Sequence, residues 1–389
     1  MKIGIEGQRL FRKKKHGMDM VALELINNIQ KIDEENEYVV FVKPDEDKSV
    51  LKESDNVKIV ELDGGPYPTW EQIALPKAAK KEGCQILHCT SNTAPIQPGM
   101  PLIITLHDII YMEKLHLFKK SGGTWYQKFG NVYRRLVVPK VMKKSDKIIT
   151  VSNFEKNRIK EFFGFDENDD RLVAIYNGVS EHFRKIDDKK ELERVKQKYH
   201  LPDRFLFFLG NTDPKKNTPG VLKAFSDYLK QTNDDMYLVM LDYEKSALDK
   251  ILDDIKAPEL IERIHLTGYV VNTDLPAIYN QCELFLYPSL RESFGIPMLE
   301  AMRCGAPVIT SNTSSMPEVS GGAAYIIDPY KPEEITQAII KILNDKSLRE
   351  ELIKKGFEQS KKFSWKNMAK EVIELYQEVY NKHYNQQKR

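Results

Sequence analysis

The chain has 389 residues, which suffices for two or three domains of ordinary size, each with its own core. Its 59 Lys and Arg residues nearly balance its 57 Asp and Glu residues, so the net charge of +2 does not indicate a nucleic-acid partner. A hydrophobic content of 41% and an aromatic content of 10% exclude a disordered chain.

The chain shows no sign of export or of membrane insertion. Its first residues, MKIGIEGQRL, contain neither an apolar h-region nor a small-residue cleavage site, so no secretory signal is expected. No segment approaches the roughly 18 apolar residues that a membrane-spanning helix needs. The cysteines have no CxxC spacing, and we expect reduced, mostly buried thiols at Cys84, Cys89, Cys282 and Cys304. These features predict a cytoplasmic protein.

Short apolar segments bounded by turn residues recur along the chain and predict β-strands. In the first half they lie at Lys2–Glu6, Tyr38–Val42, Val57–Leu62, Ile86–Cys89, Leu102–Leu106, Ile148–Ser152 and Leu172–Ile175. In the second half they lie at Phe205–Leu209, Tyr237–Leu241, Ile264–Thr267, Leu284–Tyr287, Pro307–Thr310 and Tyr325–Ile327. Helical patterns separate several of them, so βαβ units and mostly parallel sheets are expected.

The polar stretch Phe183–Lys198 interrupts this alternation, and we place the domain junction there. The predicted fold is therefore α/β, with two doubly wound, Rossmann-like domains over residues 1–182 and 183–363. After Asp328 the chain is helical, and a long final helix is expected over Phe363–His383.

The segment 114–147 is locally basic. It contains ten Lys and Arg residues and one acid, Asp146, with aromatic residues among them. One interpretation is a solvated helix whose other face packs on a sheet. The alternative is a surface for an anionic acceptor or for acidic lipid headgroups, which implies peripheral association with a membrane.

Four polar loops follow predicted strands of the second half, where ligands bind in open parallel sheets. They begin at Gly210, Gly268, Pro288 and Ser311. Within the third loop, Glu292 and Glu300 are separated by a loop and then by the first turns of a helix that has Pro297 near its start. This spacing lets the two carboxylates serve the two ends of an elongated ligand. The alternative is that Glu292 caps the helix and Glu300 is a surface residue.

The stretch 284–319 closely resembles the donor-binding signature of retaining glycosyltransferases of family 4; it reads LFLYPSLRESFGIPMLEAMRCGAPVITSNTSSMPEV. The resemblance extends to GNTDPKKN at 210–217, GYVVNTDLPAIYNQCELF at 268–285, NGV at 177–179, TLHDI at 105–109 and the loop at Gly17. It covers essentially the whole chain. It implies the GT-B fold, in which two Rossmann-like domains face each other and a C-terminal helix, here 364–389, crosses back to the first domain.

The resemblance also implies roles for residues of the second domain. Glu292 corresponds to the glutamate that contacts the transferred sugar, Glu300 to the glutamate that holds the nucleotide ribose, and Lys216 to the lysine that neutralises the diphosphate. The remaining donor-binding residues implied are Asn211, Lys215, Gly268, Tyr269, Val270, Ser293, Phe294, Gly295 and Ile296. The family often has an arginine at the position of Asn211, and Lys215 or Arg291 is a candidate substitute.

In the first domain, which is expected to bind the acceptor, the resemblance makes His107 a catalytic residue near the reacting sugar. A structural role is the alternative for this lone histidine. Gly17 corresponds to the glycine whose loop and helix N-terminus approach the diphosphate. The neighbouring Arg12–Lys15 run is expected to be a solvated loop, with acceptor binding as the alternative.

The function that the resemblance implies is transfer of a hexose from a nucleotide sugar to a glycan or lipid-linked acceptor, with retention of configuration. No metal or other cofactor is expected; the one Asp-x-Asp triplet, Asp45–Asp47, lies outside the donor motifs. GDP-mannose is favoured over UDP-glucose and UDP-GlcNAc as the donor. The alternatives on the same fold are a sugar-nucleotide epimerase, a glycoside phosphorylase and a non-catalytic nucleotide-sugar binding protein.

Overall fold

The computed structural model describes residues 1–113 and 125–385, with side chains in the helix that begins at Trp125 described from Phe129 onward. The chain divides into two compact units, and each is described by itself. The first comprises Met1–Gly178 and Ser364–Arg389, and the second comprises Val179–Phe363.

The first unit is built on a parallel sheet of seven strands in the order β3-β2-β1-β4-β5-β6-β7. The strands are β1 (Lys2–Glu6), β2 (Glu37–Val42), β3 (Val57–Glu61), β4 (Ile86–Cys89), β5 (Leu102–Thr105), β6 (Lys147–Thr150) and β7 (Leu172–Ala174). The helices are α1 (Gly17–Ile32), α2 (Tyr67–Thr69), η2 (Trp70–Ala74), α3 (Leu75–Lys81), α4 (Trp125–Lys144), α5 (Asn153–Phe163) and α14 (Trp365–Tyr380), with short turns η1 (Lys48–Val50) and η6 (Asn381–Asn385).

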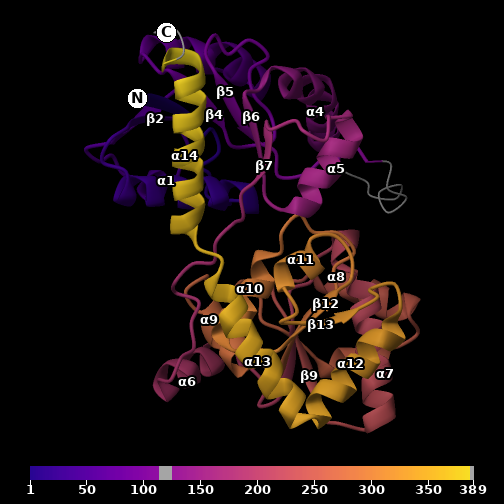
Figure 1. Ribbon diagram of the computed structural model, residues 1–389. Coiled ribbons are helices and arrows are strands. Elements are labelled where there is room, and N and C mark those ends of the chain that lie inside the picture. The colour runs from indigo at the N-terminus through magenta and orange to yellow at the C-terminus, as the bar shows by residue number, and fades with distance from the viewer. Residues whose placement is uncertain (114–124, 386–389) are drawn as a thin grey trace. The chain divides into compact units, whose positions relative to one another are not determined.

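The second unit contains a parallel sheet of six strands in the order β10-β9-β8-β11-β12-β13. The strands are β8 (Phe205–Phe208), β9 (Tyr237–Met240), β10 (Ile264–Leu266), β11 (Leu284–Tyr287), β12 (Val308–Ser311) and β13 (Tyr325–Ile327). The helices are α6 (Lys189–Lys198), η4 (Pro214–Lys216), α7 (Thr218–Thr232), α8 (Lys245–Asp254), η5 (Pro258–Arg263), α9 (Leu275–Gln281), α10 (Ile296–Cys304), α11 (Met316–Ser320), α12 (Pro332–Asn344) and α13 (Lys346–Lys361). Helices cover both faces of this sheet (Figure 1).

The predicted strands are all present, with ends that differ by at most two residues. They are identifiable because parallel strands buried on both faces are continuous runs of apolar residues. The domain junction differs from the prediction. The second unit begins at Val179 rather than at residue 183, and the polar stretch expected at the junction ends in α6, an amphipathic helix that packs on α9.

The last helix belongs to the first unit, as the resemblance implied. Helix α14 packs against α1, and the hydroxyl group of Tyr376 lies 2.7 Å from Nδ1 of the buried His88 in β4. The helix is shorter than predicted, because Ser364 caps its first turn and a wider turn, η6, follows Tyr380.

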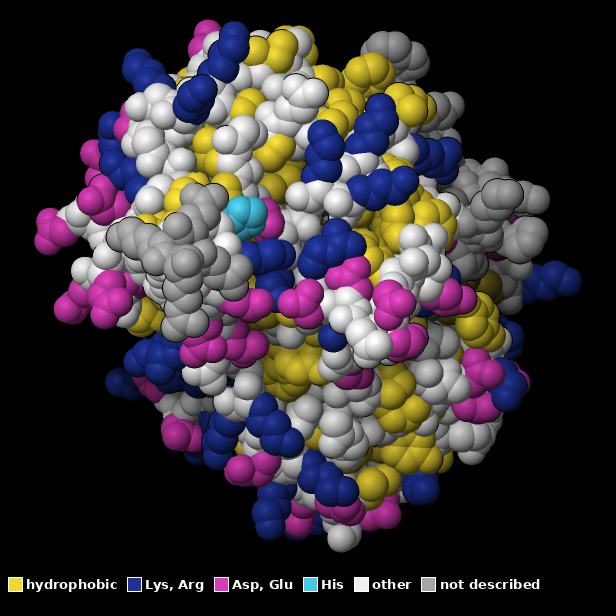
Figure 2. Space-filling model, turned by 45° about the horizontal axis from the view of Figure 1, so that its top comes forward, with side chains coloured by type: hydrophobic (Ala, Val, Ile, Leu, Met, Phe, Trp, Pro, Cys, Tyr) yellow, Lys and Arg dark blue, Asp and Glu magenta, His cyan; other side chains and the backbone are white. Residues whose placement is uncertain are grey.

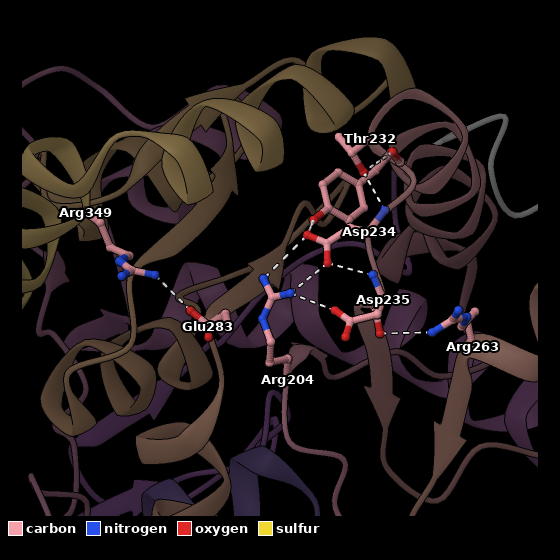
Figure 3. Close-up of polar contacts among 8 residues, drawn as sticks. Arg204, Thr232, Asp234, Asp235, Arg263, Glu283 and Arg349 are labelled. Carbon is pink, nitrogen blue, oxygen red and sulfur yellow. Dashed lines mark hydrogen bonds and ion pairs between the residues drawn. The ribbon is translucent and has the colours of Figure 1, made fainter.

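An ion-pair network closes the amino ends of three strands in the second unit (Figure 3). Arg204, just before β8, donates hydrogen bonds of 2.8 Å to Asp234 and 2.7 Å to Asp235, which precede β9. Arg263, before β10, donates to the carbonyl of Asp235. Although burial raises the pKa of Asp234, hydrogen bonds from Tyr228 and Arg204 outweigh it and lower this pKa to about 2. These charges stabilise the edge of the sheet opposite the polar loops.

Charged side chains of both signs are interspersed over the face shown in Figure 2, as the near balance of acids and bases predicts. The four cysteines are buried free thiols. Burial raises the pKa of Cys84 to about 11 and of Cys304 to about 12, so these thiols are unreactive at neutral pH.

Candidate functional site in the second unit

The strand order of the second sheet reverses between β8 and β11. From β8 the chain proceeds to β9 on one side, and from β11 it proceeds to β12 on the other. In open α/β sheets this switch point, outside the carboxyl ends of the strands, is where ligands bind. The loop after β8 contains Lys216, and the loop after β11 contains Glu292. The two residues that the resemblance singled out therefore lie at the switch point.

The side chains of Lys216 and Glu292 are in direct contact. Lys216 Nζ lies 2.6 Å from Glu292 Oε1, and the side chains retain only 15% and 12% of their exposed surface. The ammonium group also lies 5.0 Å from the centre of the Tyr287 ring and donates a hydrogen bond of 3.3 Å to its hydroxyl group. Tyr287 is the last residue of β11 and is buried. The sheet thus provides a rigid aromatic support for the lysine.

Burial by itself would raise the pKa of the Glu292 carboxyl group. The positive charges of Lys216 and Lys215 outweigh burial and, together with hydrogen bonds to the carboxylate, lower this pKa. Glu292 is therefore a carboxylate at neutral pH. A negative and a positive group are held together in a half-buried location, where charges interact more strongly than in water.

Hydroxyl groups at the end of β12 and just after it hold the backbone of the loop that carries Glu292. Ser315 donates its hydroxyl hydrogen toward the carbonyls of Glu292, at 3.1 Å, and Phe294, at 3.2 Å. Ser311 donates to the carbonyl of Ser289 at 2.7 Å, and Thr313 lies within 3.4 Å of the carbonyls of Ser289 and Leu290. Neighbouring strands thus position the loop by side-chain hydrogen bonds rather than by a sheet ladder.

Asn217 joins three loops of the same edge. It has a left-handed backbone with φ of +60°, which asparagine tolerates, and it precedes α7. Its amide nitrogen donates to the carbonyl of Pro288 at 3.2 Å and to that of Pro329 at 2.7 Å. This residue fixes the end of the 210–217 loop on which Lys216 lies.

Helix α10 begins directly beside Glu292. Gly295 caps it with a φ of +97°, a conformation that side chains disfavour, and Pro297 occupies its first turn. A Cβ atom at Gly295 would lie 2.4 Å from Met316 Cε. The free N–H groups of the first turn provide partial positive charge next to the ion pair. Ser293 and Phe294 precede the capping glycine, and Ile296 is the first residue of the helix.

Glu300 lies on α10, about one turn beyond the helix start, and is half-buried. Burial raises the pKa of its carboxyl group to about 7, although a hydrogen bond of 3.2 Å from the Tyr279 hydroxyl opposes the shift. A carboxyl group with this pKa responds to hydrogen-bond donors supplied by a ligand. Neither alternative role is observed, because Glu292 pairs with Lys216 and Glu300 is half-buried.

At the position where the family often has an arginine, this chain has the uncharged Asn211. Asn211 is exposed, and its amide oxygen accepts the Asp213 backbone N–H at 2.9 Å. The Lys215 ammonium lies 3.7 Å from the Asp213 carboxylate. Arg291 is buried and donates to the carbonyl of Glu292 at 3.2 Å. Of the two candidate substitutes, Lys215 is the more exposed and Arg291 supports the loop.

The loop after β10 contains the remaining residues of the predicted site. Gly268 has a φ of +68°, and its carbonyl accepts the Asp242 N–H at 3.0 Å. Tyr269 is 74% exposed and Val270 is half-buried. The loop therefore presents an aromatic ring to solvent at the carboxyl edge of the sheet.

His107 and Gly17 lie in the first unit. His107 follows β5 and is buried; its Nε2 lies 3.0 Å from the Thr90 carbonyl, so Nε2 carries the proton and donates. Burial lowers the pKa of His107, which leaves a neutral imidazole at pH 7. Gly17 is the exposed first residue of α1, and a Cβ atom there would meet no atom within 4 Å. Nothing in the described residues requires glycine at this position.

Three of the supporting residues were not predicted from the sequence. Tyr279 precedes the signature at 284–319, and Tyr287 lies within its apolar strand. Both tyrosines resemble core residues. Ser315 lies in a serine- and threonine-rich loop that was identified only as polar. The run of serine and threonine residues around Ser315 was the available signal that this loop supports its neighbour, because hydroxyl side chains commonly bind backbone carbonyls.

Two family models match the chain, one over each half. Residues 16–183 match the model described as Glycosyltransferase Family 4, and residues 189–359 match the one described as Glycosyl transferases group 1. The chain belongs to glycosyltransferase family 4. The match agrees with the resemblance drawn from the signature at 284–319.

Among the curated relatives, the serotype-specific mannosyltransferase WbdA of Escherichia coli is 36% identical over 235 residues, which are 59% of this chain and 28% of WbdA. The O-antigen chain mannosyltransferase B of Escherichia coli is 34% identical over 236 residues, 59% of this chain and 60% of that protein. The alignments thus cover less than two thirds of these relatives' own length.

Solved structures of low sequence identity show that the fold is GT-B. Anabaena HepE in complex with UDP and glucose aligns with a TM-score of 0.73 at 16% identity, over 97% of this chain and 99% of that one. Sucrose-phosphate synthase of Thermosynechococcus elongatus aligns with a TM-score of 0.75 at 16% identity, with the same coverage. Among the described residues, no helix has the length and apolar character needed to cross a bilayer.

Proposed function

We propose that this protein transfers a hexose from a nucleotide sugar to a hydroxyl group of a glycan or lipid-linked acceptor, with retention of configuration and without a metal ion. The observation that carries the proposal is the ion pair of Lys216 and Glu292, which lies at the switch point of the second sheet beside the start of α10. Membership of glycosyltransferase family 4 supports the reaction class.

Transfer breaks the bond between the anomeric carbon and the diphosphate oxygen. Positive charge then develops on the sugar ring and negative charge on the departing diphosphate. Lys216 and the N–H groups at the start of α10 meet the negative charge, and the Glu292 carboxylate meets the positive charge. The acceptor oxygen forms the new bond on the face that the diphosphate leaves, and its proton passes to a phosphate oxygen. Retention follows from attack on that face.

The role proposed for His107 is to bind a sugar hydroxyl group as a neutral imidazole. Its Nε2–H is committed to the Thr90 carbonyl, so the unprotonated Nδ1 is a hydrogen-bond acceptor. The Gly17 loop and the start of α1 are proposed to approach the diphosphate. Glu300 is proposed to accept hydrogen bonds from the ribose hydroxyl groups.

GDP-mannose is the proposed donor, ahead of UDP-glucose and UDP-GlcNAc. Both curated relatives described above are named mannosyltransferases, whereas HepE was solved with UDP and glucose. A thermal-shift panel of UDP, GDP and their sugars tests this order. GDP-mannose should give the largest increase in Tm, and a larger increase with UDP-glucose would overturn the assignment.

Incubation of the full chain with each nucleotide sugar, with and without EDTA, tests the reaction. Release of nucleoside diphosphate, unaffected by EDTA and lost in Lys216→Met, is expected. Loss on chelation that Mn²⁺ or Mg²⁺ restores would contradict the metal-independent mechanism. Formation of an epimerised nucleotide sugar would indicate an epimerase. Sugar release that depends on phosphate would indicate a phosphorylase. Binding of the nucleotide sugar without release of nucleoside diphosphate would indicate the non-catalytic alternative.

Peripheral association with a membrane is proposed for helix α4. Residues 114–124 of the basic segment lie outside the described residues. In the described part of α4, Val132 and Leu136 are 53% and 62% exposed, and Lys140, Lys143 and Lys144 are exposed near them. Exposed apolar and basic side chains along one helix suit an anionic lipid surface, where each basic residue contributes about 1 kcal/mol.

Co-sedimentation with vesicles tests this surface. Binding to vesicles that contain phosphatidylglycerol should exceed binding to phosphatidylcholine alone, and Leu136→Ser with Lys140→Ser should reduce it. Exposed Lys354→Ser on α13 is the control. Equal binding to both vesicle types would contradict the proposal.

A further inference from the structure

The sheet of the first unit has its own switch point, between β1 and β4, and buried charges lie at its carboxyl edge. We refer to Glu6, Arg9, Asp19 and Glu71 as the Arg9 cluster. Their exposed fractions are 2%, 9%, 1% and 1%. Glu6 is the last residue of β1, Arg9 lies in the loop that follows, and Asp19 lies in the first turn of α1. The position is equivalent to that of Lys216 and Glu292 in the second unit.

The Arg9 guanidinium has buried donors with no acceptor. Its Nε lies 3.5 Å from Asp19 Oδ1, too far for a good hydrogen bond. Among the described residues, Nε and Nη2 have no hydrogen-bond partner, and neither has the buried amide oxygen of the adjacent Gln8. A buried polar atom without a partner costs about 1–3 kcal/mol, so such atoms are rare in native proteins. Two consecutive residues therefore present unsatisfied donors and an unsatisfied acceptor.

The carboxylates of the cluster are occupied by other donors. Glu6 accepts the Gln8 backbone N–H at 2.9 Å and the Thr90 hydroxyl at 3.2 Å. Asp19 accepts the His16 backbone N–H at 2.8 Å in the cap of α1.

Glu71 accepts hydrogen bonds of 2.8 Å from the Tyr67 hydroxyl and 2.9 Å from the Gln72 amide. These bonds stabilise the carboxylates in place and leave the guanidinium without a matched partner.

The charge of the cluster restricts what can bind there. The acidic side chains of Glu6, Asp19 and Glu71 all act electrostatically on the Arg9 guanidinium. Burial raises the pKa of Glu71, but two further acids remain beside the single guanidinium, so a bound phosphate or carboxylate would meet no surplus of positive charge. The basic run nearby does not reverse this balance, because Lys13 lies 3.9 Å from Glu46 and Lys15 lies 2.5 Å from Asp47. Sugar hydroxyl groups, in contrast, accept hydrogen bonds from a guanidinium and donate to an amide oxygen without added charge.

Thr90 connects the cluster to His107. Its hydroxyl group donates to the Glu6 carbonyl at 2.8 Å, and its own carbonyl accepts from His107 Nε2. Thr90 follows β4, and His107 follows the adjacent β5. A sugar bound at Gln8 and Arg9 would therefore lie at the same sheet edge as the histidine proposed to bind the reacting sugar.

We propose that Gln8 and Arg9 form an acceptor subsite that binds an uncharged sugar residue through its hydroxyl groups. The proposal rests on the proposed glycosyl transfer and narrows its acceptor: the unit bound in the first domain is a neutral glycan residue, not a phosphorylated or acidic sugar. Arg9 donates to the hydroxyl oxygens, and Gln8 accepts a hydroxyl hydrogen.

The subsite is tested by measuring the binding of small glycosides to the full chain. Saturation-transfer NMR measures this binding in the presence of saturating nucleoside diphosphate. The probes are methyl α-D-mannopyranoside, mannose 6-phosphate and methyl α-D-mannuronoside. The variants are Gln8→Met, which preserves volume and charge, and Arg9→Lys, which preserves charge alone. Gln85→Met is the control, because Gln85 precedes β4 at the opposite edge of the same sheet.

The neutral glycoside should bind more tightly than both anionic sugars. Gln8→Met and Arg9→Lys should each weaken it by about fivefold or more, since each removes hydrogen bonds to the sugar, while Gln85→Met changes it less than about twofold. The Kd of the nucleotide should not change. Tighter binding of an anionic sugar, unchanged glycoside affinity in both variants, or no glycoside binding to the unmodified protein would overturn the subsite.

This experiment separates the subsite from the proposed function. A protein that binds the glycoside through Gln8 and Arg9 but releases no nucleoside diphosphate from any donor overturns the transferase and leaves the subsite standing. A protein that transfers sugar with the same acceptor KM in both variants overturns the subsite alone.

Discussion

Lys216 and Glu292 form an ion pair of 2.6 Å in the free protein, although the family resemblance assigns them to opposite ends of the bond that breaks. The lysine is expected to bind the diphosphate and the glutamate to contact the sugar. A bound donor must therefore compete with Glu292 for the ammonium group. The pair keeps Lys216 oriented on the Tyr287 ring before the diphosphate arrives.

Glu292→Gln should strengthen the binding of nucleoside diphosphate and reduce turnover. Removal of the carboxylate frees Lys216 and removes a negative charge near the diphosphate, so the nucleoside diphosphate should bind about three- to tenfold more tightly. Turnover should fall by about a hundredfold or more, because the charge that developed on the sugar loses its partner. Isothermal titration and a nucleotide-release assay measure the two effects.

Glu283→Gln is a matched control for this variant. Glu283 pairs with Arg349 at 2.8 Å at the amino edge of the same sheet (Figure 3). Glu283→Gln should change neither the affinity for nucleoside diphosphate nor the turnover. Weaker nucleotide binding in Glu292→Gln would mean that the glutamate supports the diphosphate site rather than competing with it.

The fold was predictable because its determinants are local and repeated. Apolar runs such as Leu284–Tyr287 identify buried parallel strands without knowledge of their neighbours. Gly295 followed by Pro297 likewise marks the start of α10.

The partners within the site were not predictable, because they depend on contacts between segments distant in sequence. Ser315 supports Glu292 from the next strand end, and Arg9 lies near Asp19 of α1 and Glu71 of η2. Tyr279 precedes Glu300 by 21 residues yet donates to it. Motif spacing contains no information on such pairs.

Nucleotide affinity should depend on the ionisation of Glu300. Burial raises the pKa of this carboxyl group to about 7 in the free protein. Ribose hydroxyl groups donate to a carboxylate, so binding requires the ionised form, and the affinity should rise as the pH increases through 7. For a single group with this pKa, binding at pH 6 should be about tenfold weaker than at pH 8. Titrations at these pH values measure the slope.

Glu300→Gln should abolish this pH dependence. The same shift has the opposite sign for folding: a carboxyl group with a raised pKa stabilises the folded protein below its unfolded pKa of 4.5, and this contribution is lost as the pH rises through about 7. Thermal unfolding at pH 5 and pH 8 should therefore show a smaller loss of stability in the variant. A flat binding profile in the unmodified protein would contradict the ribose assignment.

Ser315→Ala should reduce turnover more than donor binding. The variant loses the hydroxyl that bonds the carbonyls of Glu292 and Phe294, which leaves buried acceptors unpaired and lowers the free energy of unfolding by about 1–2 kcal/mol. Because the loop then positions Glu292 less well, kcat should fall while KM changes little. Ser320→Ala is the control, since the hydroxyl group of this buried serine donates to the Pro317 carbonyl within α11. Equal loss of kcat in both variants would remove the positioning role.

Alanine at Gly295 should lower stability, whereas alanine at Gly17 should weaken donor binding without lowering stability. Gly295→Ala forces an L residue into a φ of +97° and brings Cβ within 2.4 Å of Met316 Cε, so it should lower the free energy of unfolding by about 1–3 kcal/mol. Gly17→Ala meets open space and should leave Tm unchanged. If the diphosphate approaches the start of α1, the added methyl group should nevertheless raise the donor KM about tenfold or more. Unfolding curves and donor kinetics measured on both variants distinguish a glycine that the fold requires from one that the ligand requires; an unchanged donor KM in Gly17→Ala would place the diphosphate elsewhere.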